Sequence, residues 1–172
     1  GNMSLILSKY QRANIPVMLG NVVSNERGQV PFSSVATVNW LQIKSTLNKH
    51  DAVNEIARLG TLLKTEKNAA NYYQLGLNLQ LIERHSEAKK AFILAKDYDL
   101  LRFRAPTEFN EVIKRLSAEY KVALVDVQSM FNDHADNGVI GDELILEHLH
   151  PTVEGYFLLA EAYVELIIEK SL

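Results

Sequence analysis

The stretch IPVMLGNVV, residues 15–23, gives the clearest fold signal in the sequence. It is a near-continuous apolar run with β-branched residues, bounded by turn-forming residues, which predicts a strand buried on both faces of a parallel sheet. The shorter run KVALVDV, residues 121–127, predicts a second such strand. A loop rich in Ser, Asn, Gly and Pro follows the first strand over residues 24–34. Because ligands of open α/β sheets bind at the carboxyl edge of the strands, we expect a site near this loop.

Most of the remaining sequence has the three- and four-residue apolar spacing of helices. This spacing predicts helices over residues 4–13, 36–48, 51–64, 68–82, 85–98 and 107–120, and a last helix that Pro151 opens. Within 68–98, the spacing of one tetratricopeptide repeat is shared by Tyr72, Leu75, Gly76, Leu79, Ala88, Phe92 and Ala95. A solenoid needs about three or more repeats, so we expect a helical hairpin packed on a larger body.

Composition excludes several classes of protein. The 172 residues are 47% hydrophobic and 23% charged, which is typical of a compact domain. The chain has no cysteine, so thiolate nucleophiles, zinc–cysteine sites and redox motifs are excluded. The net charge is −3 with scattered Lys and Arg, so we expect no nucleic-acid partner. The most apolar stretch, 156–168, contains two glutamates, so we expect no membrane span.

Two strands of the buried, parallel type do not make a stable sheet alone, because such sheets need several neighbouring strands and both faces covered. We therefore expect further strands from a segment upstream of Met3 or from another copy of the chain. The first possibility is simpler. The second would make the exposed sheet edge a homodimer interface.

The strongest chemical motif is Glu147-His148-Leu149-His150-Pro151-Thr152. A loop histidine fixed by a proline, with a carboxylate three residues upstream, predicts a proton-transfer pair in which Glu147 binds one ring nitrogen of His150 and the other faces substrate. One alternative is a metal site of His148 and His150 with Glu147 or Glu154. Another is that His150 only caps or packs at the helix start. Zinc needs three or four converging ligands, so we expect no metal, and nothing indicates an organic cofactor.

Three segments together resemble one enzyme family. VALVDVQSMFNDHADNGVIGDELILEHLHPTVEGYFLLAEAYVELI (122–167) is similar to the C-terminal block of the SGNH (GDSL-like) hydrolase superfamily, where an acidic-x-x-His-Pro motif precedes the last helix. IPVMLGNVVSNERGQVPFSS (15–34) and AKDYDLLRFRAPTEFNEVI (95–113) resemble segments of a subgroup with a tetratricopeptide-like insertion. The resemblance implies an α/β fold, a partial flavodoxin-like parallel sheet, with SGNH-like segments at 3–35 and 100–172 and a helical insertion at 36–99.

The resemblance implies a serine esterase or acyl transferase that acts on a small-molecule ester or acylated substrate. His150 matches the family's general base, and Glu147 stands where the family usually has Asp. The family's nucleophile lies in a Gly-Asp-Ser block, whereas here Glu143 follows the only Gly-Asp pair. The family's oxyanion blocks are missing too. We therefore expect the nucleophile to lie outside this chain, and the isolated chain to be inactive or nearly so.

Other polar residues have weaker signals. Asn25 is a candidate donor to substrate, or a residue that permits an unusual backbone angle. Arg104 is a candidate for holding an anionic substrate group, or for pairing with a nearby Asp. Ser24, Ser33 and Ser34 lie on the loop after the first strand, where serines usually make turn hydrogen bonds. The rival to an enzyme is a binding module in which residues 36–98 present a groove to a protein partner and His150 is buried.

Overall fold

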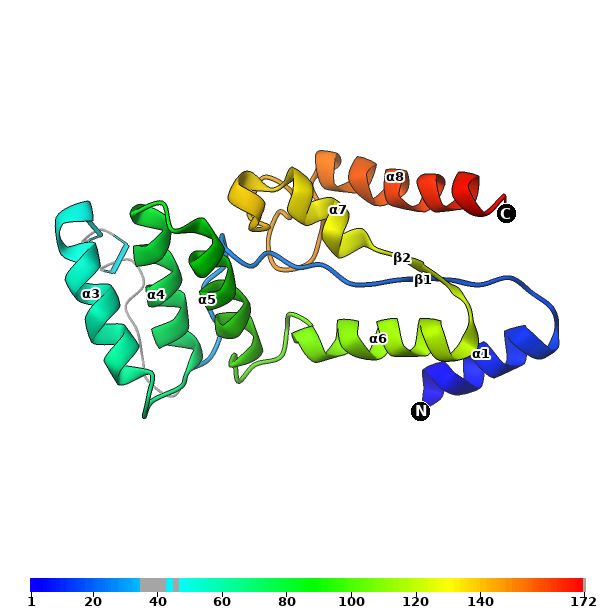
Figure 1. Cartoon of the computed structure of the whole chain (residues 1–172), viewed down its shortest axis with the longest axis horizontal. Coiled ribbons are helices and arrows are strands. Elements are labelled where there is room, and N and C mark those ends of the chain that lie inside the picture. The colour runs from blue at the N-terminus through cyan, green and yellow to red at the C-terminus, as the bar shows by residue number, and fades with distance from the viewer. Residues whose placement is uncertain (35–42, 45–46, 172) are drawn as a thin grey trace.

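The computed structural model describes residues 1–34, 43–44 and 47–171. Over these residues the protein is mostly helical (Figure 1). The elements are α1 (Asn2–Arg12), β1 (Met18–Gly20), α3 (Lys49–Leu62), α4 (Ala69–Leu81), α5 (His85–Asp97), α6 (Thr107–Tyr120), β2 (Ala123–Val125), α7 (Val127–His134), the 3-10 turn η1 (Asp136–Gly138) and α8 (Val153–Lys170). The helices predicted at 51–64, 68–82, 85–98 and 107–120 are confirmed as α3 to α6. The helix predicted at 36–48 lies largely outside the described residues.

The predicted fold class is wrong. The described residues form a helical, bundle-like structure with only a two-stranded sheet, and not a flavodoxin-like α/β fold. The two apolar runs do pair in parallel, but over three residues each, with Met18 opposite Ala123 and Gly20 opposite Val125. An apolar, β-branched run favours extended backbone but does not set the number of neighbouring strands. Within the described part of the chain, β1 and β2 each pair only with the other, so the sheet stays at two strands and most of the structure is helical.

Helices flank the strand pair on two sides. Figure 1 shows α6 along one side and α7 and α8 along the other, with α3, α4 and α5 stacked at one end. α6 contacts both strands, and α8 contacts β2. α1 lies at the end of the strand pair away from α3 to α5 and packs on α6. The α3–α5 group therefore adjoins the carboxyl ends of the strands, where the chain leaves β1 and β2.

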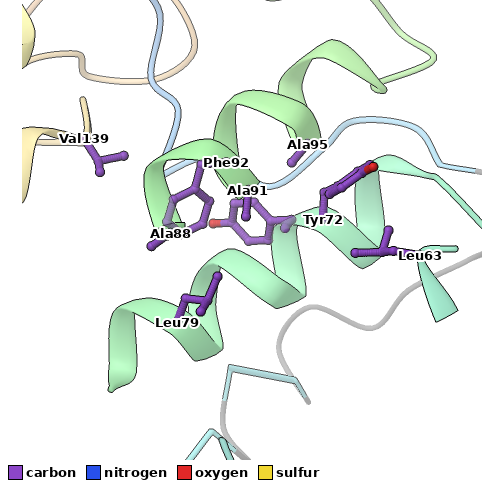
Figure 2. Packing of buried hydrophobic residues seen from close by; sticks show 9 residues of the cluster. Leu63, Tyr72, Leu79, Ala88, Ala91, Phe92, Ala95 and Val139 are labelled. Carbon is purple, nitrogen blue, oxygen red and sulfur yellow. The ribbon is translucent and has the colours of Figure 1, made fainter. Parts of the chain in front are cut away.

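The predicted helical hairpin is confirmed as α4 and α5, which pack against each other closely (Figure 2). Gly76 allows the approach, because a Cβ atom there would lie 2.7 Å from the Phe92 ring. The rings of Tyr73 and Phe92 meet edge to face with centroids 5.4 Å apart. The Tyr73 hydroxyl donates a hydrogen bond to the Arg27 carbonyl at 2.8 Å, which ties the hairpin to the loop after β1. The buried cluster consists of Leu63, Tyr72, Tyr73, Leu79, Ala88, Ala91, Phe92, Ala95 and Val139.

A second apolar cluster lies beneath the segment that joins α7 to α8. It consists of Val125, Val127, Phe131, Ala135, Ile140, Leu144, Ile145, Leu158 and Ala162. Ile140 and Ile145 are fully buried and anchor both ends of the intervening turn. This packing supports the polar loop at residues 146–150. None of the described helices combines the length and the apolar character needed to cross a bilayer.

Candidate proton-transfer site

The loop that carries the Glu147–His150 motif is closed by hydrogen bonds of its own. Ile145 and Pro151 form an antiparallel bridge, and the Leu146 N–H donates to the His150 carbonyl at 2.8 Å. Thr152 caps α8 by accepting from the Gly155 N–H at 3.1 Å. Gly155 is needed there, because a Cβ atom would lie 2.2 Å from the Leu144 carbonyl oxygen. These contacts hold residues 146–150 as a short loop at the start of α8.

The predicted contact between Glu147 and His150 is confirmed. Glu147 Oε1 accepts a hydrogen bond from His150 Nδ1, and also from the His150 backbone N–H at 3.0 Å. The second oxygen, Oε2, accepts from the backbone N–H of His148 and from His148 Nδ1, the latter at 3.1 Å. Both carboxylate oxygens are therefore occupied by histidine donors.

These hydrogen bonds define the protonation of the pair. They lower the pKa of Glu147 to about 2, the His148 backbone N–H being the largest cause and the His150 side chain the next. An ionised carboxylate only accepts hydrogen bonds, so the proton of neutral His150 sits on Nδ1 and Nε2 is the basic position. The His150 side chain is 76% exposed, and no described residue hydrogen-bonds its Nε2. Nε2 can therefore accept a proton from a group outside this loop.

The side chain of Asn25 is buried under the motif loop. Its Nδ2 donates to Asp142 Oδ1 at 2.7 Å and to the Ile145 carbonyl at 3.0 Å, while its Oδ1 accepts from the Gly28 N–H at 2.7 Å. Its backbone N–H donates to the His148 carbonyl at 3.0 Å. Asn25 therefore joins the loop after β1 to the motif loop. Its predicted contact with substrate stays a prediction.

Arg104 is also buried, and its guanidinium binds groups of this chain. Nη1 donates to the carbonyls of Asn25 and Gln29 at 2.9 and 3.1 Å, and Nη2 lies 3.3 Å from Asp99 Oδ2. Burial lowers the pKa of Arg104, and the Asp99 carboxylate opposes that shift. The pairing with a nearby Asp, which was the alternative for this residue, is thus present. Its predicted contact with an anionic substrate group stays a prediction.

The three candidate serines make no hydrogen bond to His148 or His150 in the described residues. Ser34 Oγ donates to Asn68 Oδ1 at 3.2 Å and accepts from the Ala70 N–H at 3.3 Å. The Ser33 carbonyl accepts from the Leu100 N–H, and Ser24 is buried. Over residues 1–34, 43–44 and 47–171, no serine hydroxyl is hydrogen-bonded to His148 or His150. A nucleophile for His150 is therefore not assembled in the part of the chain that the structure describes.

A metal site does not assemble at the motif either. The two histidines each use Nδ1 to bind Glu147. In the described portion of the chain, no cluster of three or more His, Cys, Asp or Glu side chains has an arrangement that could hold a metal ion. The alternative with His148, His150 and Glu147 or Glu154 is thus not supported.

Sequence reasoning missed the aromatic neighbours of His148. The Phe32 ring stacks on the His148 ring with centroids 4.0 Å apart, and the Phe103 ring meets it edge to face at 5.6 Å. Phe32 and Phe103 lie in two loops far apart in sequence. Neither loop has a periodic pattern, so no local signal could have joined them to the motif.

A hollow lies at the other end of the strand pair. Its volume is about 960 Å³, and its lining includes Val17, Ala123, Tyr120 and Asn14. Val17 precedes β1, whereas the Glu147–His150 loop adjoins residues that follow β1. The hollow is therefore separate from the proton-transfer pair.

Comparison with known proteins adds no relative. No protein-family model matches the chain, and neither a curated protein nor a solved structure matches it.

Proposed function

We propose that this chain supplies the general base and its orienting carboxylate to an ester hydrolase or acyl transferase of the SGNH type. His150 is the base and Glu147 orients it. The nucleophilic serine belongs to polypeptide outside the 172 residues, because the sequence has no Gly-Asp-Ser block. The similarity of residues 122–167 to the C-terminal block of that family supports the reaction class.

The observation that carries the proposal is the hydrogen bond from His150 Nδ1 to Glu147 Oε1. It fixes the tautomer and the ring orientation, as the carboxylate does in a Ser-His-Asp triad. The exposed His150 ring then presents Nε2 to an incoming hydroxyl.

The reaction proceeds in two balanced stages. As the serine oxygen attacks the ester carbonyl, Nε2 of His150 takes the hydroxyl proton and then passes it to the leaving alkoxide, which departs as the alcohol. Water, or a second alcohol in a transferase, then attacks the acyl-serine with the same proton path, and the serine proton is restored. Glu147 stays ionised throughout because its pKa is lowered to about 2, and it stabilises the imidazolium that forms at each stage.

The binding-module alternative is less well supported. It required a buried His150, whereas the side chain is 76% exposed. A protein partner for this helical segment stays a prediction, and part of the segment lies outside the described residues.

The test uses the protein expressed from its complete reading frame. A fluorophosphonate probe should label one serine outside residues 3–172, and p-nitrophenyl acetate should be hydrolysed. His150→Ala should abolish both signals, with a loss of kcat on the order of 10³-fold or more. Glu147→Gln should lower kcat with little change in KM, because the orienting carboxylate acts in the transition state.

Arg58→Ala serves as the control variant, because Arg58 pairs with Glu55 on the exposed face of α3. It should leave labelling and hydrolysis unchanged. Absence of labelling in the complete protein, or labelling and hydrolysis that survive His150→Ala, would refute the proposed function.

A further inference from the structure

We propose that His148 is a positioning residue that fixes the Glu147 carboxylate against His150. This inference deepens the proposed function, and its meaning for catalysis rests on that function. That His148 determines how Glu147 faces His150 is argued from the geometry of the loop alone.

The two oxygens of Glu147 divide between the two histidines. Oε1 binds Nδ1 and the backbone N–H of His150, and Oε2 binds Nδ1 and the backbone N–H of His148. A glutamate at the surface would otherwise rotate freely about its side-chain bonds, at a cost in entropy whenever it bound His150. Because His148 holds the second oxygen, the carboxylate plane is fixed before any substrate arrives.

His148 is itself held in place by aromatic rings. Phe32 stacks on it with an interplanar angle of 24°, and Phe103 meets it edge to face. The rings of Phe32 and Phe103 also contact each other, with centroids 5.2 Å apart. The His148 side chain is only 18% exposed, against 76% for His150. The two histidines therefore differ in role: one is packed and the other is free at Nε2.

The backbone that carries Phe32 is in turn held by a buried ion pair. Asp99 accepts hydrogen bonds from the backbone N–H groups of Phe32 at 2.8 Å and Ser33 at 3.0 Å, and its Oδ2 lies 3.3 Å from Arg104 Nη2. The Leu100 N–H donates to the Ser33 carbonyl at 3.1 Å, which joins the two loops that carry Phe32 and Phe103. A continuous set of contacts thus runs from Asp99 through Phe32 and His148 to Glu147.

The experiment determines which ring nitrogen of His150 carries the proton in the 172-residue chain. It records the ¹⁵N chemical shifts of the two ring nitrogens at a pH where His150 is neutral. The wild type should show His150 protonated on Nδ1. His148→Phe keeps a ring against Phe32 and the backbone donor to Glu147 Oε2, but removes the side-chain donor Nδ1. It should shift His150 towards the Nε2-protonated form that free histidine prefers. His148→Asn keeps an amide donor near the position of Nδ1 and should restore the wild-type shifts.

Dispersed amide spectra verify that each variant is folded, and His148→Leu replaces His148→Phe if the latter is not. Wild-type His150 shifts in His148→Phe would overturn the proposal. So would equal loss of the Nδ1 form in His148→Phe and His148→Asn, since the hydrogen bond would then not be the cause. The readout does not involve ester hydrolysis. A protein that fails the fluorophosphonate test would therefore refute the proposed function without changing the tautomer result.

Discussion

Four donors around one carboxylate explain why a surface glutamate behaves as a fixed anion. Glu147 lies on an exposed loop, yet the N–H and Nδ1 groups of His148 and His150 all point to it. Hydrogen bonds to the charged form of a carboxyl group favour ionisation, and here they lower its pKa from 4.5 to about 2.

The shift predicts how Glu147 affects stability. Because the pKa of the folded state lies below that of the unfolded state, the contribution of Glu147 is complete above about pH 4.5 and is lost as pH falls towards 2. A ¹³C titration of the side-chain carboxyl should show it ionised at pH 3. Glu147→Gln should remove this part of the acid dependence of unfolding. A midpoint near the ordinary value of 4.5 would contradict the hydrogen-bond arrangement.

Breaking the Asp99–Arg104 pair should destabilise the fold far more than breaking an exposed pair. Both side chains are almost fully buried, and Asp99 also accepts three backbone N–H groups, those of Phe32, Ser33 and Leu101. Asp99→Ala leaves a buried guanidinium without its partner, which costs about 3–5 kcal/mol in comparable cases. Urea denaturation should show this loss. Arg84→Ala breaks an exposed pair with Glu87 and should leave the free energy of unfolding almost unchanged. If Asp99→Ala and Arg84→Ala lowered the free energy of unfolding equally, this prediction would be wrong.

At the scale of elements, the periodicity of the sequence predicted helices well and strands poorly. α6 spans residues 107–120 as expected, because its apolar spacing and the preceding Pro106 are local signals. The run 15–23 was expected to be a long strand, but only Met18–Gly20 forms a ladder. The length of a strand depends on neighbouring strands that no local sequence pattern reveals. For this reason the prediction of an α/β fold was wrong.

The α4–α5 contact provides a test of close helix packing. Gly76→Ala would place a Cβ atom 2.7 Å from the buried Phe92 ring. Overpacking of a core costs about 1–3 kcal/mol, which exceeds the roughly 0.5–1 kcal/mol that alanine gains over glycine in a helix. We expect Gly76→Ala to lower the thermal midpoint, and Phe92→Leu to recover part of the loss when the two are combined.

Gly60 in α3 is the matched control, because a Cβ atom there meets nothing within 4 Å. Gly60→Ala should raise the midpoint through helix propensity alone. If the two glycine variants have the same effect, then the close approach of α4 to α5 is not what Gly76 provides.

At the scale of the whole molecule, the sequence predicted the contacts of the candidate site only between residues that are close together in the chain. Glu147 and His150 lie three residues apart beside Pro151, so their contact follows from one short loop. The burial of Asn25 and Arg104 depends on contacts with residues more than 70 positions away. The packing of Phe32 on His148 is of the same long-range kind. No pattern in a single sequence encodes such pairings.

The outward side of α8 is the other whole-molecule feature, because it leaves large apolar side chains in solvent. Those exposed are Val153, Tyr156, Phe157, Val164, Ile167 and Ile168. Exposed apolar clusters of this kind mark surfaces of association. Together with the outer edges of β1 and β2, which pair with no further strand in the described residues, they predict that the isolated chain self-associates, which was the second of the two possibilities drawn from the sequence.

The double variant Phe157→Glu with Ile168→Glu tests this surface. The two side chains are 69% and 72% exposed, so the substitutions should change the free energy of unfolding by no more than about 0.5 kcal/mol each. Light scattering over a concentration series should show a mass that rises for the wild type and stays nearer that of one chain for the variant. Binding of the apolar dye ANS should fall as well. Val53→Glu changes a residue on α3 that is 61% exposed, and it should leave both signals as in the wild type. A large drop in thermal midpoint for the double variant would mean that these side chains are packed within the monomer, and that the open face of α8 is not a surface for association.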